Sequence, residues 1–176
     1  GKGITRFHAI YWPAILLSAG LELPKKIFVH EYINVEGQKM SKTLGNVVDP
    51  VQLIEKYGKD AIRYYLLAKV SPFQDGDFSE EKLKETYNSD LANGLGNLVS
   101  RVAKLCENLK IVIEDKPLSV DPDVINFLND FKFKDALTSQ WQEITKADRE
   151  INDSKPWELT KEKAEPILRD LVQKIR

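Results

Sequence analysis

The pattern of hydrophobic positions changes part-way along the chain. From Ser79 onward, apolar residues recur every three or four positions, which is the period of an amphipathic helix. The longest apolar stripe runs through Leu83, Tyr87, Leu91, Leu95, Leu98, Val102, Leu105 and Leu109. Two further helices are predicted over 123–130 and 134–152, and a last one follows Trp157 to Arg176. We expect a helical bundle here, one that ends before it is closed.

The first part of the chain has a mixed pattern. Residues 27–33 are β-branched and aromatic, which predicts a strand buried on both faces. Asp49-Pro50 is a typical helix start, with an N-cap followed by proline at the first helical position. In chain order the predicted elements are a helix over 4–19, the strand, a turn over 35–38, a polar loop over 39–46, and helices over 49–58 and 60–70.

Charge and cysteine content exclude several classes of protein. The 176 residues carry 26 basic and 27 acidic side chains, so the chain does not bind nucleic acid by bulk positive charge. Residues 1–70 hold ten basic and six acidic residues, a net charge of +4, and residues 71–176 hold sixteen and twenty-one, a net charge of −5. Cys106 is the single cysteine, which excludes an internal disulfide framework and a multi-cysteine zinc site and agrees with a reducing cytosol.

The N-terminal stretch raises the question of a targeting segment. A charged, an apolar and a small-residue region follow one another there, as in a signal peptide, but Trp12-Pro13 interrupts the apolar run. No apolar run reaches the roughly 20 residues that span a bilayer. The chain also lacks an initiator methionine, so we expect a piece of a longer protein.

The segment Lys39-Met40-Ser41-Lys42-Thr43 has the most specific chemistry in the chain. Two lysines flank a serine in a polar loop bounded by glycines, so ammonium and hydroxyl groups can meet a polyphosphate. Donors that arrive as charge develops on a leaving pyrophosphate lower the barrier of its release. The alternative is a solvated basic loop between a strand and a helix.

A second set of residues lies near the N-terminus. Ile4, His8 and Trp12 are spaced four and four apart, which places them on one face of a helix. Such a face can line an apolar pocket. The alternative is a face buried in the core, with a histidine whose hydrogen bonds are satisfied there.

A third set lies in the predicted bundle. Asn97 and Arg101 are four residues apart, and Trp157 follows Pro156 at a break between helices. An asparagine, an arginine and a tryptophan together can read a single-stranded RNA loop by hydrogen bonding and stacking. The alternatives are an exposed polar pair and a tryptophan that plugs the core.

These motifs resemble a known family. The Lys39–Thr43 segment looks like the signature loop of class I aminoacyl-tRNA synthetases, and Val29-His30 before it and the 45–50 stretch after it resemble the same family. Within that class the whole chain is most similar to the methionyl-tRNA synthetases. The resemblance implies a mixed, mostly α fold, in which the C-terminal part of a Rossmann-type α/β nucleotide-binding domain precedes a helical anticodon-binding bundle. The implied divisions are 1–34 for the end of the catalytic domain, 35–78 for the loop and a connecting region, and 79–176 for the bundle.

The resemblance also implies residue roles in a methionine–tRNA ligase, which activates methionine with ATP and transfers it to tRNA(Met). Lys39 and Lys42 would contact the ATP phosphates, with the greater role for Lys42. One position departs from the family, because Gly3 stands where an aspartate is usual. The implied roles are catalysis for Lys39, Met40, Ser41, Lys42 and Thr43; ATP binding also for Val29 and His30; methionine binding for Ile4, His8 and Trp12; and recognition of the CAU anticodon for Asn97, Arg101 and Trp157.

The same resemblance implies cofactors and partners. ATP with Mg²⁺ is a substrate, zinc belongs to the full-length family only, and this chain has no zinc ligands. Asp75 and Asp77 are interpreted as turn and cap residues, since two carboxylates alone seldom hold a metal. The expected partners are tRNA(Met), methionine, ATP and a missing N-terminal portion as a separate chain, in the cytoplasm and away from membranes.

Several alternatives stay open at this point. The chain could be a fragment of another class I synthetase, such as the leucyl, isoleucyl or cysteinyl type, or a non-catalytic tRNA-binding module. It could also be one half of a naturally split enzyme. Because the family's other ATP motif, which contains histidine, is absent from the sequence, we expect no activation of methionine by this chain alone.

Overall fold

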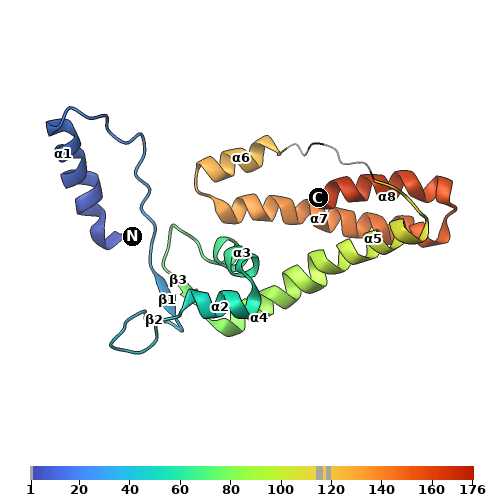
Figure 1. Ribbon diagram of the computed structural model, residues 1–176, viewed down its shortest axis with the longest axis horizontal. Helices are drawn as coiled ribbons and strands as arrows, with labels where there is room; N and C mark the ends of the chain where they lie inside the picture. The colour runs from blue at the N-terminus through green and yellow to red at the C-terminus, as the bar shows by residue number, and fades with distance from the viewer. Residues whose placement is uncertain (1, 114–116, 118–119) are drawn as a thin grey trace.

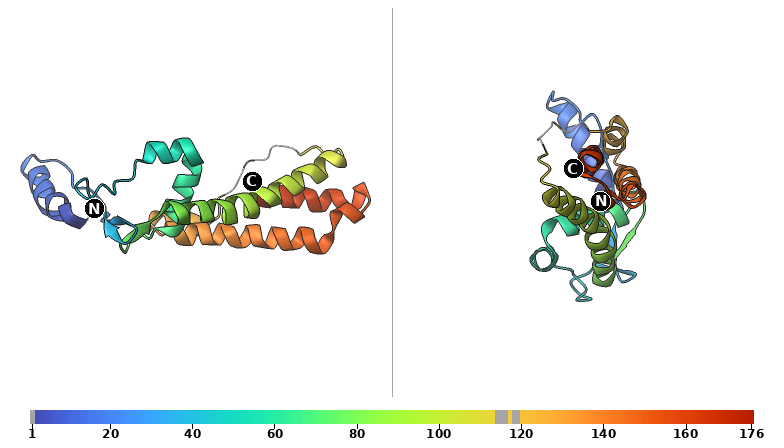
Figure 2. Two further views of the ribbon diagram at one scale, coloured as in Figure 1. Left: turned by 90° about the horizontal axis from the view of Figure 1, so that it is seen from below. Right: turned by 90° about the vertical axis from the view of Figure 1, so that its right-hand side faces the viewer.

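The computed structural model describes residues 2–113, 117 and 120–176, and these form an elongated molecule (Figures 1 and 2). A helical segment stands at one end, formed by the 3-10 turn Lys2–Ile4, the π-helical turn Phe7–Tyr11 and α1 (Trp12–Ser18). Pro13 lies just after the π-helical turn, inside one continuous helical run, so its missing N–H falls where the helical hydrogen-bonding pattern changes from π to α. The helical prediction for residues 4–19 is confirmed in outline, although no residue of these three elements is buried.

A small mixed sheet lies beside this segment. Its strands are β1 (Ile33–Val35), β2 (Gln38–Lys39) and β3 (Gly76–Phe78), in the order β2-β1-β3. β1 is antiparallel to β2 and parallel to β3. The turn predicted over residues 35–38 joins β1 to β2, and both of its central residues, Glu36 and Gly37, have positive φ, as a tight hairpin requires.

The strand predicted over residues 27–33 is wrong. Ile33 is its one residue in a strand, and Ile27, Val29 and Tyr32 are 37%, 37% and 38% exposed rather than buried on both faces. A strand needs a neighbour to hold it, and β-propensity reports packing against such neighbours. Within the described residues, the long-range backbone hydrogen bonds of this stretch lie at its end, where the Glu31 N–H donates to the Pro72 carbonyl and the Gly76 N–H donates to the Tyr32 carbonyl.

Two helices follow the 39–46 loop as predicted. α2 (Pro50–Tyr57) begins where the Asp49 carboxylate accepts a hydrogen bond from the Val51 N–H at 2.9 Å, and it ends at Gly58, whose φ is +81°. α3 (Lys59–Lys69) continues from there. Together with β3 and α4 (Glu80–Thr86) these helices enclose a first apolar cluster of Leu53, Ile62, Tyr65, Phe78 and Leu83.

The long predicted helix is built from three consecutive parts. α4 is followed directly by the π-helical stretch Tyr87–Gly96 and then by α5 (Asn97–Asn108), which Figure 1 shows as one nearly continuous rod. The remaining helices are α6 (Pro122–Asn129), α7 (Phe133–Ser154) and α8 (Lys161–Ile175), with the 3-10 turn Pro156–Glu158 between the last two. The predicted break at 155–157 is confirmed. The sequence also predicts a connector over 114–122, between the long helix and the next one, and most of it lies outside the described residues.

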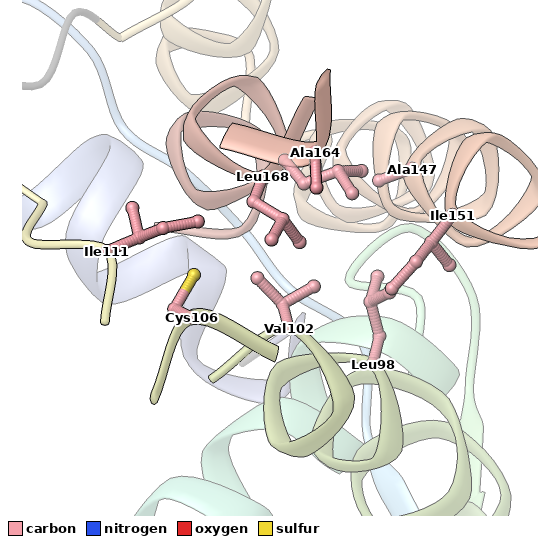
Figure 3. Packing of buried hydrophobic residues seen from close by; sticks show 9 residues of the cluster. Leu98, Val102, Cys106, Ile111, Ala147, Ile151, Ala164 and Leu168 are labelled. Carbon is pink, nitrogen blue, oxygen red and sulfur yellow. The ribbon is translucent and has the colours of Figure 1, made fainter. Parts of the chain in front are cut away.

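A second apolar cluster holds the bundle together. Side chains from α5, α7 and α8 converge there, as Figure 3 shows. Its buried members are Leu98, Val102, Cys106, Ile111, Ala147, Ile151, Ala164, Leu168 and Leu171. None of the helices in the described part of the chain is long and apolar enough to cross a membrane.

Candidate active-site and RNA-binding residues

The 39–46 loop is closed at its base by Asn46. The Asn46 side chain accepts a hydrogen bond from the Ser41 N–H at 2.8 Å and donates one to the Lys39 carbonyl at 3.2 Å. The Gly45 N–H donates to the Lys42 carbonyl, and Gly45 has a φ of +68° that favours glycine. These local bonds hold the loop as a defined turn that projects from β2.

The loop presents two cations to solvent. Lys39 and Lys42 are exposed, and neither ammonium has an ion-pair partner among the described residues. Met40 and Ser41 are half-buried, and the Ser41 hydroxyl accepts a hydrogen bond from the Thr43 N–H at 3.3 Å. Such an arrangement can meet a polyanion, because ammonium groups bind phosphate oxygens by charge-assisted hydrogen bonds.

The predicted methionine-binding residues lie on an open surface. Ile4 is 51% exposed and Trp12 43%, and the Nδ1 atom of His8 lies 3.1 Å from the Ile4 carbonyl oxygen. An open hollow of about 790 Å³ adjoins this segment. It is lined by Lys2, Gly3, Arg6, Phe7, Tyr11 and Ile15. The three predicted residues therefore do not enclose a pocket by themselves.

Val29 and His30 are exposed in the segment that leads into β1. The Nδ1 atom of His30 lies 2.9 Å from the Glu31 carbonyl oxygen. Within the part of the chain that the structure describes, no hydrogen bond or ion pair joins these two residues to the 39–46 loop.

Gly3 is constrained by Tyr32. A Cβ atom at position 3 would lie 2.3 Å from the Tyr32 hydroxyl oxygen, so any other residue there requires the tyrosine to move. The Lys2 ammonium lies 5.0 Å from the centre of the Tyr32 ring and pairs with Glu31 and Asp75. The hydrogen bonds of Lys2 to these two carboxylates raise the pKa of its ammonium group, and the one to Glu31 has the larger effect. The departure at Gly3 is therefore matched by a tyrosine that occupies the adjacent space.

Arg101, on α5, meets α7 and the turn that follows it. One terminal amino group of Arg101 donates to the Asp148 carboxylate at 3.3 Å, and the other donates to the Asn152 side-chain oxygen at 2.7 Å. Its guanidinium carbon lies 5.9 Å from the centre of the Trp157 ring. Asn97 is exposed one turn earlier on the same helix.

Trp157 is 48% exposed, so the interpretation as a core plug is wrong. The buried residue of this turn is Pro156, which directly follows Lys155, the left-handed C-cap residue of α7. The exposed indole beside a guanidinium group offers a stacking face and hydrogen-bond donors on one surface.

No group of three metal-ligating side chains is found within the described ranges. Asp75 and Asp77 instead join segments, since they accept hydrogen bonds from the N–H groups of Tyr32 and Gly37. Cys106 is buried in the bundle, and burial raises the pKa of its thiol.

Comparison with known proteins decides the family. Residues 1–103 match the family model described as tRNA synthetases class I (M). The chain belongs to the methionyl-tRNA synthetase family. This membership excludes the leucyl, isoleucyl and cysteinyl alternatives, and the chain is part of a methionyl-tRNA synthetase.

Relatives and solved structures of methionyl-tRNA synthetase agree with this. The methionine–tRNA ligase of Caldanaerobacter subterraneus is 42% identical over all of this chain and 31% of its own length, and that of Nostoc is 42% identical over all of this chain and 37% of its own. The Mycobacterium tuberculosis methionyl-tRNA synthetase in complex with methionyl-adenylate matches 99% of this chain and 38% of its own, with a TM-score of 0.80 and 34% identity. Its apo form matches with a TM-score of 0.77 and 33% identity. The chain thus spans about a third of the length of these synthetases.

Sequence reasoning gave no role to two residues at the surface around Trp157. Asp148 and Asn152 both contact Arg101. Asn152 opens the 152–157 stretch that resembles the family's anticodon-reading elements, but neither residue was itself assigned a role. Their spacing of four on a predicted helix shows that they share a face. It does not show that this face meets α5.

Proposed function

We propose that the chain contributes to both steps of methionyl-tRNA synthesis. In this proposal Lys39–Thr43 binds ATP while methionine is activated, and the bundle binds tRNA(Met) through its CAU anticodon. The observation that carries the proposal is the likeness, over 99% of the chain, to a synthetase in complex with methionyl-adenylate. That compound is the product of ATP and methionine, so it supports both as substrates, with Mg²⁺ accompanying ATP. The proposed function belongs to the cytoplasm, where tRNA is charged.

The cluster shared by α5, α7 and α8 supports the proposed division of the chain, since all of its members lie within 79–176. One cluster lies within the connecting region and the start of α4, and the other joins α5, α7 and α8. The proposed boundary at 78/79 coincides with the N-cap Ser79, whose hydroxyl accepts a hydrogen bond from the Lys82 N–H. The proposed boundary at 34/35 falls inside β1. Residues 1–34 would then be the end of the Rossmann-type domain.

The loop would act on the departing pyrophosphate. As the bond between the α- and β-phosphates breaks, negative charge moves onto the leaving group, and ammonium groups near it lower the energy of that state. The exposure of Lys39 and Lys42 and their lack of ion-pair partners among the described residues support this role. Ser41 and Thr43 would keep the loop in shape.

The proposed methionine site needs a second wall. Ile4, His8 and Trp12 suit a thioether, since an aromatic ring contacts sulfur favourably and no buried charge is present. Because these side chains are exposed here, we propose that parts of the full-length synthetase outside these 176 residues complete the pocket. In this proposal Tyr32 occupies the space next to Gly3.

The activation step is tested by ATP–pyrophosphate exchange. We expect no exchange with the chain alone, because it spans about a third of its relatives. This expectation would be refuted by a measurable exchange rate that is abolished by Lys42→Ala. The control is Lys25→Ala, at another exposed lysine, which should leave that rate unchanged. Co-purification of a partner that restores exchange would support a natural split enzyme.

The RNA-binding step is tested by titration with two hairpins. One carries the anticodon stem-loop of tRNA(Met) with CAU, and the other is the same hairpin with an altered anticodon. We expect tighter binding of the CAU hairpin. Trp157→Ala should weaken that complex by about 1–3 kcal/mol, the worth of one stacked base. Phe73→Ala, which removes an exposed aromatic outside the bundle, should leave it unchanged. Equal affinity for both hairpins would overturn the anticodon assignment.

A further inference from the structure

The contacts of Arg101 form a small network on α7. Asp148 and Asn152 are four residues apart on that helix, and each accepts a hydrogen bond from a different terminal amino group of Arg101, at 3.3 Å and 2.7 Å. Two separate acceptors restrict both the position and the rotation of a guanidinium plane, which a single acceptor would not do.

The acceptor at position 152 is itself oriented. The Asn152 amide nitrogen donates to the Asp148 backbone carbonyl at 2.6 Å and lies 3.4 Å from the Asp148 carboxylate. With the nitrogen so placed, the amide oxygen points to Arg101. Asp148 therefore contributes directly through its carboxylate and indirectly by setting the orientation of Asn152.

This network leaves donors for a ligand. A guanidinium group has five N–H bonds, and two of them are used here. The group lies 5.9 Å from the centre of the Trp157 ring, which is itself half-exposed. A base that stacks on the indole would meet the remaining N–H groups at a defined place, and defined donors discriminate between base edges better than mobile ones.

We propose that Asp148 and Asn152 are positioning residues that hold Arg101 for reading the anticodon of tRNA. The inference rests on the proposed anticodon-binding function of Arg101 and Trp157. It adds that the preference for CAU depends on two residues of α7 that act through Arg101.

The test is a double-mutant cycle on the 176-residue chain, with the two hairpins described above as probes. The quantity measured is the ratio of the two affinities. Asp148→Asn and Asn152→Ala should each lower the CAU preference about fivefold to tenfold, the range of a close coupled pair. In an Arg101→Ala background, neither substitution should lower the preference further.

A matched control separates positioning from charge. Asp148→Asn removes one negative charge near RNA and would raise the affinity for any hairpin. Asp153→Asn makes the same change at an exposed position of α7 for which the structure shows no contact with Arg101. It should raise both affinities equally and leave their ratio unchanged.

Each outcome decides the matter. The inference would be overturned if Asp148→Asn left the ratio of the two hairpin affinities unchanged or raised it. It would also be overturned if Asp148→Asn lowered this ratio equally in the wild-type and the Arg101→Ala backgrounds. A wild-type chain with no CAU preference would overturn the proposed function and this inference with it.

A measurement without RNA tests positioning separately. In the RNA-free chain, ¹⁵Nε NMR should show an ordered Arg101 side chain that becomes mobile in Asn152→Ala and stays ordered in Asp153→Asn. A side chain equally mobile in all three proteins would overturn the positioning role, whatever the hairpins show.

Discussion

The bundle core makes Leu168→Ala a demanding test of the fold. Leu168 lies on α8 with 0% exposure and packs in the cluster shared by α5, α7 and α8. The substitution removes three carbon atoms, which at about 0.8 kcal/mol each amounts to about 2.4 kcal/mol of lost transfer free energy. The cavity left behind adds to this, so we expect a loss of about 3–4 kcal/mol in the free energy of unfolding.

The assay is urea denaturation followed by far-UV circular dichroism. With a slope of about 1.5 kcal/mol per molar urea, the midpoint should fall by about 2 M. Leu128→Ala on α6 is the matched control, because that leucine is 47% exposed and its loss should cost less than about 1 kcal/mol. Losses of equal size for the two variants, or a loss below about 1 kcal/mol for Leu168→Ala, would refute the assignment of Leu168 to the core.

Three further predictions concern single positions. In the folded chain Cys106 should react slowly with a disulfide reagent at pH 8, because burial raises the pKa of its thiol. In denaturant it should react at the rate of a simple thiol. Rapid reaction of the folded chain would contradict this prediction. The hydrogen bond from the Gly37 N–H lowers the pKa of Asp77, so the ionised carboxylate stabilises the fold above the unfolded pKa, and that stability is lost as pH falls through the folded pKa. Asp77→Asn should therefore flatten the dependence of the urea midpoint on pH below about 4, and an unchanged slope would refute this. Helix propensity alone favours alanine over Gly96 by about 1 kcal/mol. Gly96→Ala should nevertheless lower the melting temperature, because the Cβ of the alanine would lie 2.8 Å from the Leu91 carbonyl oxygen.

Elements with local signals could be predicted from the sequence. Asp49 caps α2 and Gly58 ends it as expected, because both effects depend on the backbone within a few residues. In the predicted apolar stripe, Leu83, Leu98 and Val102 are buried as the spacing predicts, whereas Tyr87 is 38% exposed. The strand predicted over 27–33 failed for the opposite reason. Strand formation depends on partners elsewhere in the chain, and the pairing of β1 with its neighbours includes only the last residue of that stretch, Ile33.

The candidate RNA site likewise combines features set by local sequence with contacts between distant parts of the chain. The sequence places Asn97 and Arg101 on one helix face, but the partner of Arg101 at Asn152 is 51 positions away and is brought to it by the packing of the bundle. Whether Trp157 faces the core or solvent is decided by the turn before it. Lys155 takes a left-handed conformation and Pro156 is the buried residue, so the indole is left exposed. A Pro-Trp dipeptide marks such a break in the sequence without showing which of its two rings is buried, and that choice separates a core residue from a stacking platform.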